Sequence, residues 1–94
     1  MNRQEKLILA RNKIDLLDKK IFDLIKTRTK VVKHMLMLKE SRRQIVDTKR
    51  IKKILLNIKK KSIKNKIDPR ITSQIWKSMI WAYVKYQRRN FRKK

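Results

Sequence analysis

The chain has 94 residues with no glycine, one proline and no cysteine, and its 30 Lys and Arg against seven Asp and Glu give a formal net charge of +23. This length allows one domain, and a chain so short buries little surface when it folds alone. Without cysteine there are no disulfides or thiolate metal sites, and no apolar run approaches the roughly 20 residues of a membrane-spanning helix. The apolar stretch near the N-terminus is too short for a signal peptide. We therefore expect one soluble, cytoplasmic domain over residues 1–94.

The near absence of glycine and proline predicts a few long helices and no strands, and the first helix is predicted over residues 4–40. Its apolar positions recur at steps of three and four residues, which is typical of a helix that packs along its whole length. They are Ala10, Ile14, Leu17, Ile21, Leu24, Val31, Met35 and Leu38. Such a helix is about 55 Å long at 1.5 Å per residue, longer than a compact globule of this size. We therefore expect it to pack against a second copy of the chain.

Residues 41–46 break the periodic pattern and are predicted to form a loop, followed by a second helix over residues 47–64. Asp68-Pro69 predicts the start of a third helix, because Asp caps free backbone N–H groups and Pro suits the first helical position. This helix is predicted to run to residue 90. Its inward side chains are expected to be Ile71, Ile75, Trp76, Met79, Ile80 and Tyr83. The basic tail over residues 88–94 is expected to fray.

Arg28 occupies a position in the apolar pattern of the first helix, where a guanidinium is costly unless it is paired. It either pairs with a carboxylate such as Asp18 or Asp23, extends to solvent, or forms a buried anion site. Lys39 is eleven residues further on, which on a continuous helix places it on nearly the same face, about 16 Å away. Two long cationic side chains on one face can bind an anion between them, although a lone lysine there is most often solvated.

Four further residues are candidates for a polar site, and each also has an ordinary structural interpretation. Arg11 lies about 100° around the first helix from Arg28, so it suits a pocket of an antiparallel partner better than its own; otherwise it is a surface arginine. Asp47 and Arg50 lie one turn apart, as a helix cap and a surface cation also do. Gln87 shares a face with Ile80 and Tyr83 and is expected to point into the bundle or to lie at its polar rim.

Other kinds of chemistry find no support in the sequence. His34 is the single histidine and lies among lysine and methionine, where a surface or packing role is expected. There is no Ser/His/Asp set, metal-ligand cluster or Gly-rich phosphate loop. Trp76 and Trp81 are expected to pack between helices.

The first helix resembles that of the all-helical (AroQ-class, type II) chorismate mutases, in the run Leu7-x-x-Ala10-Arg11-x-x-Ile14-Asp15-x-Leu17-Asp18-x-x-Ile21-x-x-Leu24-Ile25-x-x-Arg28. Lys39, the Asp47-x-x-Arg50 pair and Gln87 fall at the spacings of the family's lysine, its Asp-x-x-Arg-Glu segment and its late glutamine. The similarity covers about residues 7–88. It implies an all-α fold in which two three-helix protomers interlock into a six-helix homodimer with two shared sites.

The resemblance also implies an isomerase that rearranges chorismate to prephenate in phenylalanine and tyrosine biosynthesis, with no metal, cofactor or covalent intermediate. Arg28, with Arg11 from the partner subunit, would bind the two carboxylates of the substrate. Lys39 and Gln87 would donate to the ether oxygen as it gains negative charge. Asp47, Arg50 and Tyr83 would complete the substrate-binding wall.

Three positions depart from the family pattern. The glutamate that contacts the substrate hydroxyl is Ile51 here, the small hydroxyl residue one turn before the glutamine is Tyr83, and the loop proline is Ile45. The loss of the glutamate predicts weaker recognition of the hydroxyl, and an isochorismate-pyruvate lyase on the same fold is one alternative.

The net charge supports a further alternative, a basic helical protein that binds nucleic acid through residues 59–61 and 88–94. A purely structural helical dimer is a third. The lysine- and isoleucine-rich composition that an A/T-rich genome imposes accounts for most of the charge, so we expect neither a nucleic-acid partner nor a membrane partner.

Overall fold

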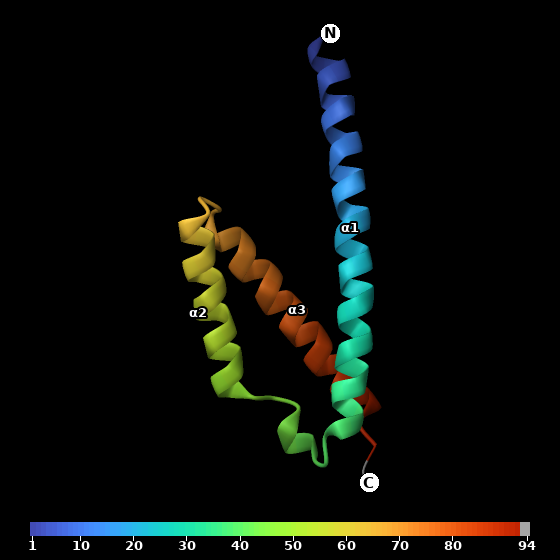
Figure 1. Ribbon diagram of the computed structural model, residues 1–94, viewed down its shortest axis with the longest axis vertical. Helices are drawn as coiled ribbons and strands as arrows, with labels where there is room; N and C mark the ends of the chain where they lie inside the picture. The colour runs from blue at the N-terminus through green and yellow to red at the C-terminus, as the bar shows by residue number, and fades with distance from the viewer. Residues whose placement is uncertain (93–94) are drawn as a thin grey trace. The chain divides into compact units, whose positions relative to one another are not determined.

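The computed structural model describes residues 1–92, and within them it contains three α-helices, one short 3-10 helix and no strand (Figure 1). The elements are α1 (Arg3–Leu38), η1 (Arg42–Gln44), α2 (Thr48–Lys64) and α3 (Pro69–Asn90). The predicted all-α class and number of helices are confirmed. None of the helices in the described part is both long and apolar enough to cross a membrane. Of the basic tail, residues 88–90 continue α3, whereas Lys93 and Lys94 lie outside the described residues.

The chain divides into two compact units, Met1–His34 and Met35–Lys94. The first unit consists almost entirely of α1, whose 36 residues make a helix about 54 Å long. The apolar side chains that form its periodic pattern are about half exposed or more: Ile14 54%, Leu17 52%, Ile21 53%, Leu24 71% and Val31 53%. The pattern that predicted a packed helix face therefore stays uncovered within the described chain. No residue of this unit is buried.

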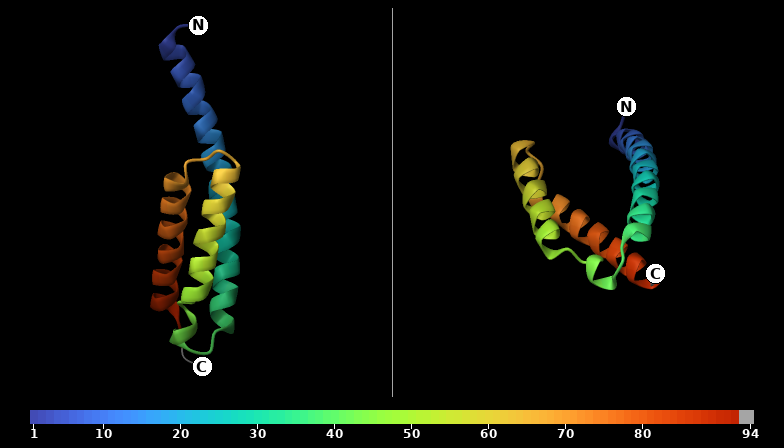
Figure 2. Two further views of the ribbon diagram at one scale, coloured as in Figure 1. Left: turned by 90° about the vertical axis from the view of Figure 1, so that its left-hand side faces the viewer. Right: turned by 60° about the horizontal axis from the view of Figure 1, so that its bottom comes forward.

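The second unit is an antiparallel pair of helices, α2 and α3, with the last turn of α1 and the connecting loop (Figures 1 and 2). Its core consists of Ile45, Ile80 and Val84, which are 5%, 8% and 3% exposed. Partly buried apolar side chains surround this cluster: Val46, Ile51, Ile54, Leu55 and Phe91. The loop before α2 thus contributes a core residue, Ile45, which the sequence pattern did not indicate.

The apolar stripe of α3 is wider than the face that α2 covers. Ile80 is buried, and Trp76, Met79 and Tyr83 are half-buried as predicted. Within one chain Ile71 and Ile75 do not pack inward as predicted, since they are 57% and 51% exposed. A buried contact between the hydroxyls of Ser62 and Thr72, 2.6 Å apart, joins α2 and α3 near their connection.

Local side-chain and backbone contacts set the helix ends. Asp47 and Asp68 are the N-caps of α2 and α3, and their carboxylates accept hydrogen bonds from the backbone N–H groups of Arg50 and Arg70. The end of α2 is closed by two backbone hydrogen bonds, from Ile67 N to Ser62 O and from Lys66 N to Ile63 O. This is the Schellman arrangement, and it places Lys66 at a φ of 58° in the left-handed region.

Candidate active site

The centre of the candidate site is a hydrogen bond between Lys39 and Gln87. Lys39 Nζ donates to Gln87 Oε1 at 2.6 Å, across 48 positions of sequence. Gln87 is 7% exposed, and its Nε2 donates to the backbone carbonyl of Tyr83 at 3.3 Å, which orients the amide. The expected inward direction of Gln87 is confirmed. Two side chains that the sequence analysis selected separately therefore meet in the second unit.

Lys39 itself does not lie on a helix. The prediction that α1 extends to residue 40 is wrong, because the helix ends at Leu38 and the backbone N–H of Lys39 donates to Leu36 O in a tighter turn. Lys39 therefore directly follows the last residue of α1, and its helical spacing from Arg28 holds only approximately. The side chain reaches Gln87 from the connecting loop, beside the C-terminal part of α3.

The ammonium of Lys39 lies in a partly desolvated setting. Burial lowers the pKa of Lys39 below its usual value, and the negative charge of Asp47 raises the pKa and so offsets part of that effect. Asp47 thus has two roles, since the same carboxylate also caps α2 by accepting from Arg50 N at 3.0 Å. The ordinary interpretation of Asp47 as a helix cap is confirmed. Its negative charge also acts on the ammonium of Lys39.

A shallow groove surrounds Lys39 where the loop meets the start of α2. It is lined by Lys39, Arg43, Gln44, Val46, Asp47, Thr48 and Lys49. Gln44 shapes the loop, because its Oε1 accepts from the backbone N–H groups of Glu40 and Ser41 at 2.6 and 3.2 Å. Arg43 and Lys49 add two positive charges that the sequence analysis did not select. Helical periodicity does not indicate Arg43, because this residue belongs to the short helix η1.

Arg11 and Arg28 are both carried by α1 in the first unit. Seventeen residues separate them, which is about 25 Å along the helix axis and about 100° around it. Arg28 is half-buried with its Nη1 atom buried, whereas Arg11 is exposed. Arg50, on α2, is exposed. One α1 helix therefore presents the two arginines to different sides.

Two of the departures from the family pattern lie in the apolar core of the second unit. Ile45, which takes the place of a loop proline, is a buried member of the core cluster. Ile51, which takes the place of the glutamate, packs partly buried against the same cluster. The two substitutions therefore extend one apolar contact region. Tyr83 is half-buried and contributes its backbone carbonyl to Gln87.

The described groups suit the binding of an anion and the stabilisation of developing negative charge. An ammonium has three N–H donors and an amide Nε2 has two, so Lys39 and Gln87 keep N–H donors beyond those in the hydrogen bonds to Gln87 Oε1 and Tyr83 O. Such donors act most strongly where water is partly excluded, as it is around Lys39. Donors of this kind can stabilise negative charge by position and electrostatics alone.

Comparison with known proteins identifies the class. The family model described as chorismate mutase type II matches residues 10–88, which is most of the chain and includes all of the candidate site residues. The chain belongs to the type II chorismate mutase family. No curated protein and no solved structure matches the chain.

Proposed function

We propose that this protein is a chorismate mutase that rearranges chorismate to prephenate, and that it supplies phenylalanine and tyrosine biosynthesis in the cytoplasm. The observation that carries the proposal is the hydrogen bond of 2.6 Å between Lys39 Nζ and Gln87 Oε1. Lys39 and Gln87, at the positions of the family's lysine and late glutamine, are in contact although they lie near opposite ends of the second unit's sequence. Family membership over residues 10–88 supplies the reaction class.

The reaction is intramolecular, since an ether C–O bond breaks while a C–C bond forms within one molecule. Lys39 and Gln87 donate to the ether oxygen, whose negative charge grows in the transition state. The buried Gln87 amide is held by Tyr83 O, so its donor direction is fixed before the substrate binds. The chain supplies orientation and charge, and it needs no proton transfer at the reacting carbon atoms.

Arg28 and Arg11 bind the two carboxylates of the substrate, with Arg11 supplied by the partner subunit. The separation of the two arginines by about 25 Å along α1 supports this division, because it is too large for both to grip one small molecule from the same helix. The half-buried Arg28 interrupts the apolar pattern of α1 where a guanidinium needs an anion. Asp47, Arg50 and Tyr83 complete the polar wall, and Arg43 and Lys49 add positive charge around Lys39.

The homodimer is supported by the apolar side chains that α1 leaves exposed. Leu17, Ile21 and Leu24 are 52%, 53% and 71% exposed, and they recur along one face of the helix. A single described chain gives that face no cover. A second copy aligned with it buries the apolar face and brings Arg11 of one subunit toward the pocket of the other.

The activity is tested by following chorismate loss by absorbance with purified protein and then identifying the product. Prephenate as the product supports the proposal. Release of pyruvate from isochorismate without prephenate formation would replace it with the lyase reaction. The control for substitutions of the candidate site residues is Lys30→Ala. This variant loses an exposed charge on α1 and is expected to leave the rate unchanged.

The shared site is tested by mixing two inactive variants, Arg11→Ala and Arg28→Ala. If Arg11 acts in the partner's pocket, each mixed dimer has one intact site and one site that lacks both arginines. Activity is then expected to return on mixing, to part of the wild-type rate. A mixture that stays inactive after verified subunit exchange would show that both arginines serve the same chain's site.

A further inference from the structure

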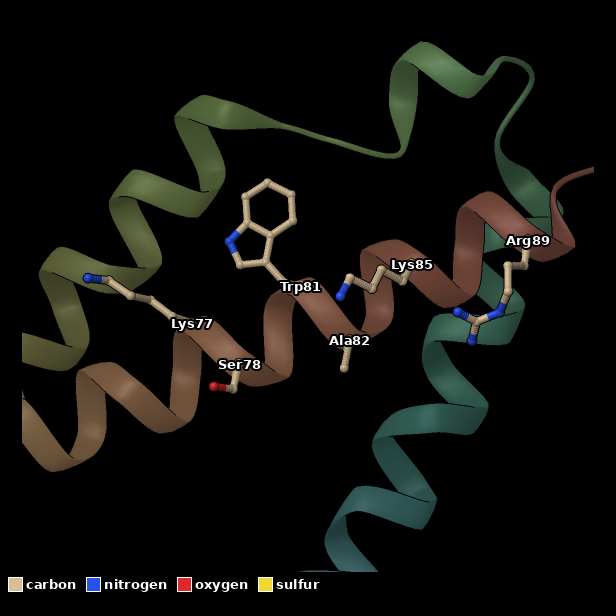
Figure 3. Close-up of a pocket in the computed structure, with 6 residues that line it drawn as sticks. All are labelled: Lys77, Ser78, Trp81, Ala82, Lys85 and Arg89. Carbon is tan, nitrogen blue, oxygen red and sulfur yellow. The ribbon is translucent and has the colours of Figure 1, made fainter.

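A second cationic surface lies on α3, outside the candidate active site. It is a shallow groove lined by Lys77, Ser78, Trp81, Ala82, Lys85 and Arg89, all of them exposed (Figure 3). Trp81 is 44% exposed, and Figure 3 shows its indole standing off the helix with Lys77 and Lys85 one turn to either side. Within one chain Trp81 does not pack between helices, contrary to expectation. We call these six residues the α3 groove.

Most of the α3 groove faces away from Gln87. Lys85 and Arg89 are each two residues from the buried Gln87, so they point about 160° away from it around the helix. By the same geometry Trp81 points about 120° away, and Lys77 lies about 80° around the helix and about 15 Å along its axis. Lys77, Trp81, Lys85 and Arg89 follow one another at intervals of four residues, and this row spans about 18 Å of helix. A ligand on this row is therefore separate from a substrate at Gln87.

The charge around the groove has one sign. Residues 41–94 contain 19 Lys and Arg but two acidic residues, Asp47 and Asp68, and neither α2 nor α3 contains an acidic side chain. The cations of the row thus have no carboxylate on their own helix or on the helix packed against it. A polyanion is the complementary partner, because it gains contacts with the row and releases its counterions.

Composition alone gave no reason to expect a nucleic-acid partner, but the exposed Trp81 within a cationic row does. We propose that the α3 groove binds single-stranded nucleic acid without sequence preference. Lys77, Lys85 and Arg89 contact phosphates along the strand, and a base stacks on the exposed indole of Trp81, between Lys77 and Lys85. Proteins that bind single strands combine a cationic track with aromatic side chains in this way.

The features of the groove select this partner among polyanions. A duplex keeps the faces of its bases stacked inside, so Trp81 would have no base to stack on. A membrane surface requires an apolar face, but the other uncharged residues of the groove, Ser78 and Ala82, are small. An acidic peptide satisfies the cations and supplies no planar ring for the indole.

The test uses the full-length chain and a short fluorescein-labelled oligothymidylate, with binding followed by fluorescence anisotropy over a range of salt. Three phosphate contacts predict a slope of log K against log salt of about −2, since each contributes about −0.7 on a single strand. Trp81→Ala is expected to weaken binding by about 5- to 150-fold, and Trp81→Phe by less, because a phenyl ring still stacks. Circular dichroism verifies that each variant is folded.

The matched control separates a defined groove from general attraction to a basic protein. The variant Lys77→Gln/Lys85→Gln/Arg89→Gln loses three charges from the groove, whereas Lys52→Gln/Lys59→Gln/Lys60→Gln loses three exposed charges from α2. The first is expected to abolish most of the salt dependence and the second to preserve it. Equal losses in the two variants, an unaffected Trp81→Ala variant, or equal affinity for a duplex, polyglutamate or phosphatidylserine vesicles would overturn the proposal. Chorismate turnover, measured in parallel, is not expected to change in the groove variants.

Discussion

The two units of this chain bury their apolar side chains in different ways. Residues 35–94 form a small core of their own, in which Ile45, Ile80 and Val84 are at most 8% exposed. Residues 1–34 carry as regular an apolar pattern, yet none of them is buried. The periodicity of apolar residues alone therefore does not show which surface buries a helix face. In the second unit the cover comes from the same chain, and for the first unit we propose that it comes from another copy.

The largest effect is expected from changing the apolar face of α1. Leu17→Glu/Ile21→Glu places two carboxylates where the proposed dimer buries apolar surface, and an unpaired buried charge costs about 3–5 kcal/mol. Sedimentation equilibrium is expected to show loss of the dimer, together with loss of turnover. The control, Lys19→Glu/Lys26→Glu, places two carboxylates on the opposite side of the helix and is expected to stay dimeric. A dimeric Leu17→Glu/Ile21→Glu protein with normal turnover would show that this face is not the interface.

The next effect concerns the polar centre of the second unit. Lys39→Ala removes the ammonium that contacts Gln87, and kcat/KM is expected to fall about 10²- to 10³-fold, as when a donor to transition-state charge is lost. The dimer is expected to persist, because Lys39 is not part of the α1 face. A loss of kcat/KM smaller than about tenfold in a folded dimer would show that Lys39 has no such role.

The smallest effect is a change in pH dependence. If Lys39 donates to the substrate as we propose, activity requires its ammonium form, and burial lowers the pKa of Lys39, so activity should fall at a pH below the usual range for lysine. Asp47→Asn removes the charge that raises this pKa, and it retains a side-chain oxygen that can cap α2. The alkaline fall in kcat is therefore expected to move to lower pH.

Asp68→Asn provides the control for the pH measurement, because Asp68 caps α3 and does not contribute to the pKa of Lys39. Its pH profile is expected to match that of the wild type. If Asp47→Asn and Asp68→Asn give the same profile, the charge of Asp47 does not act on the group whose titration limits activity.

The helices themselves were predictable from local signals. Asp68-Pro69 indicated the start of α3 at its observed residue, since capping and a fixed proline φ act locally. The second helix was predicted from residue 47, and in the structure that residue is its cap. The end of α1 was predicted two residues too late, because neither glycine nor proline marks it.

The parts of the structure that depend on contacts between residues distant in sequence were harder to predict from the sequence. The sequence indicated Lys39 and Gln87 through a resemblance to a family, but it did not show that Lys39 reaches Gln87 from a loop. Nor did it show that Ile45 is a core residue, because a single isoleucine in a polar loop has no periodicity. The burial of Ile45 depends on Ile80 and Val84 of α3, which lie 35 and 39 positions further along the chain.

The turn between α2 and α3 shows how a chain without glycine closes a helix. Lys66 occupies a left-handed position that glycine ordinarily fills, at a cost of about 1–2 kcal/mol for a residue with a Cβ atom. The backbone hydrogen bonds from Ile67 and Lys66 hold this conformation in place. In protein engineering, this turn is a position where stability can be gained. Glycine at position 66 removes the conflict between the Cβ atom and the backbone, and the position is far along the chain from Lys39 and Gln87. Lys66→Gly is therefore expected to recover stability that substitutions at the candidate site remove.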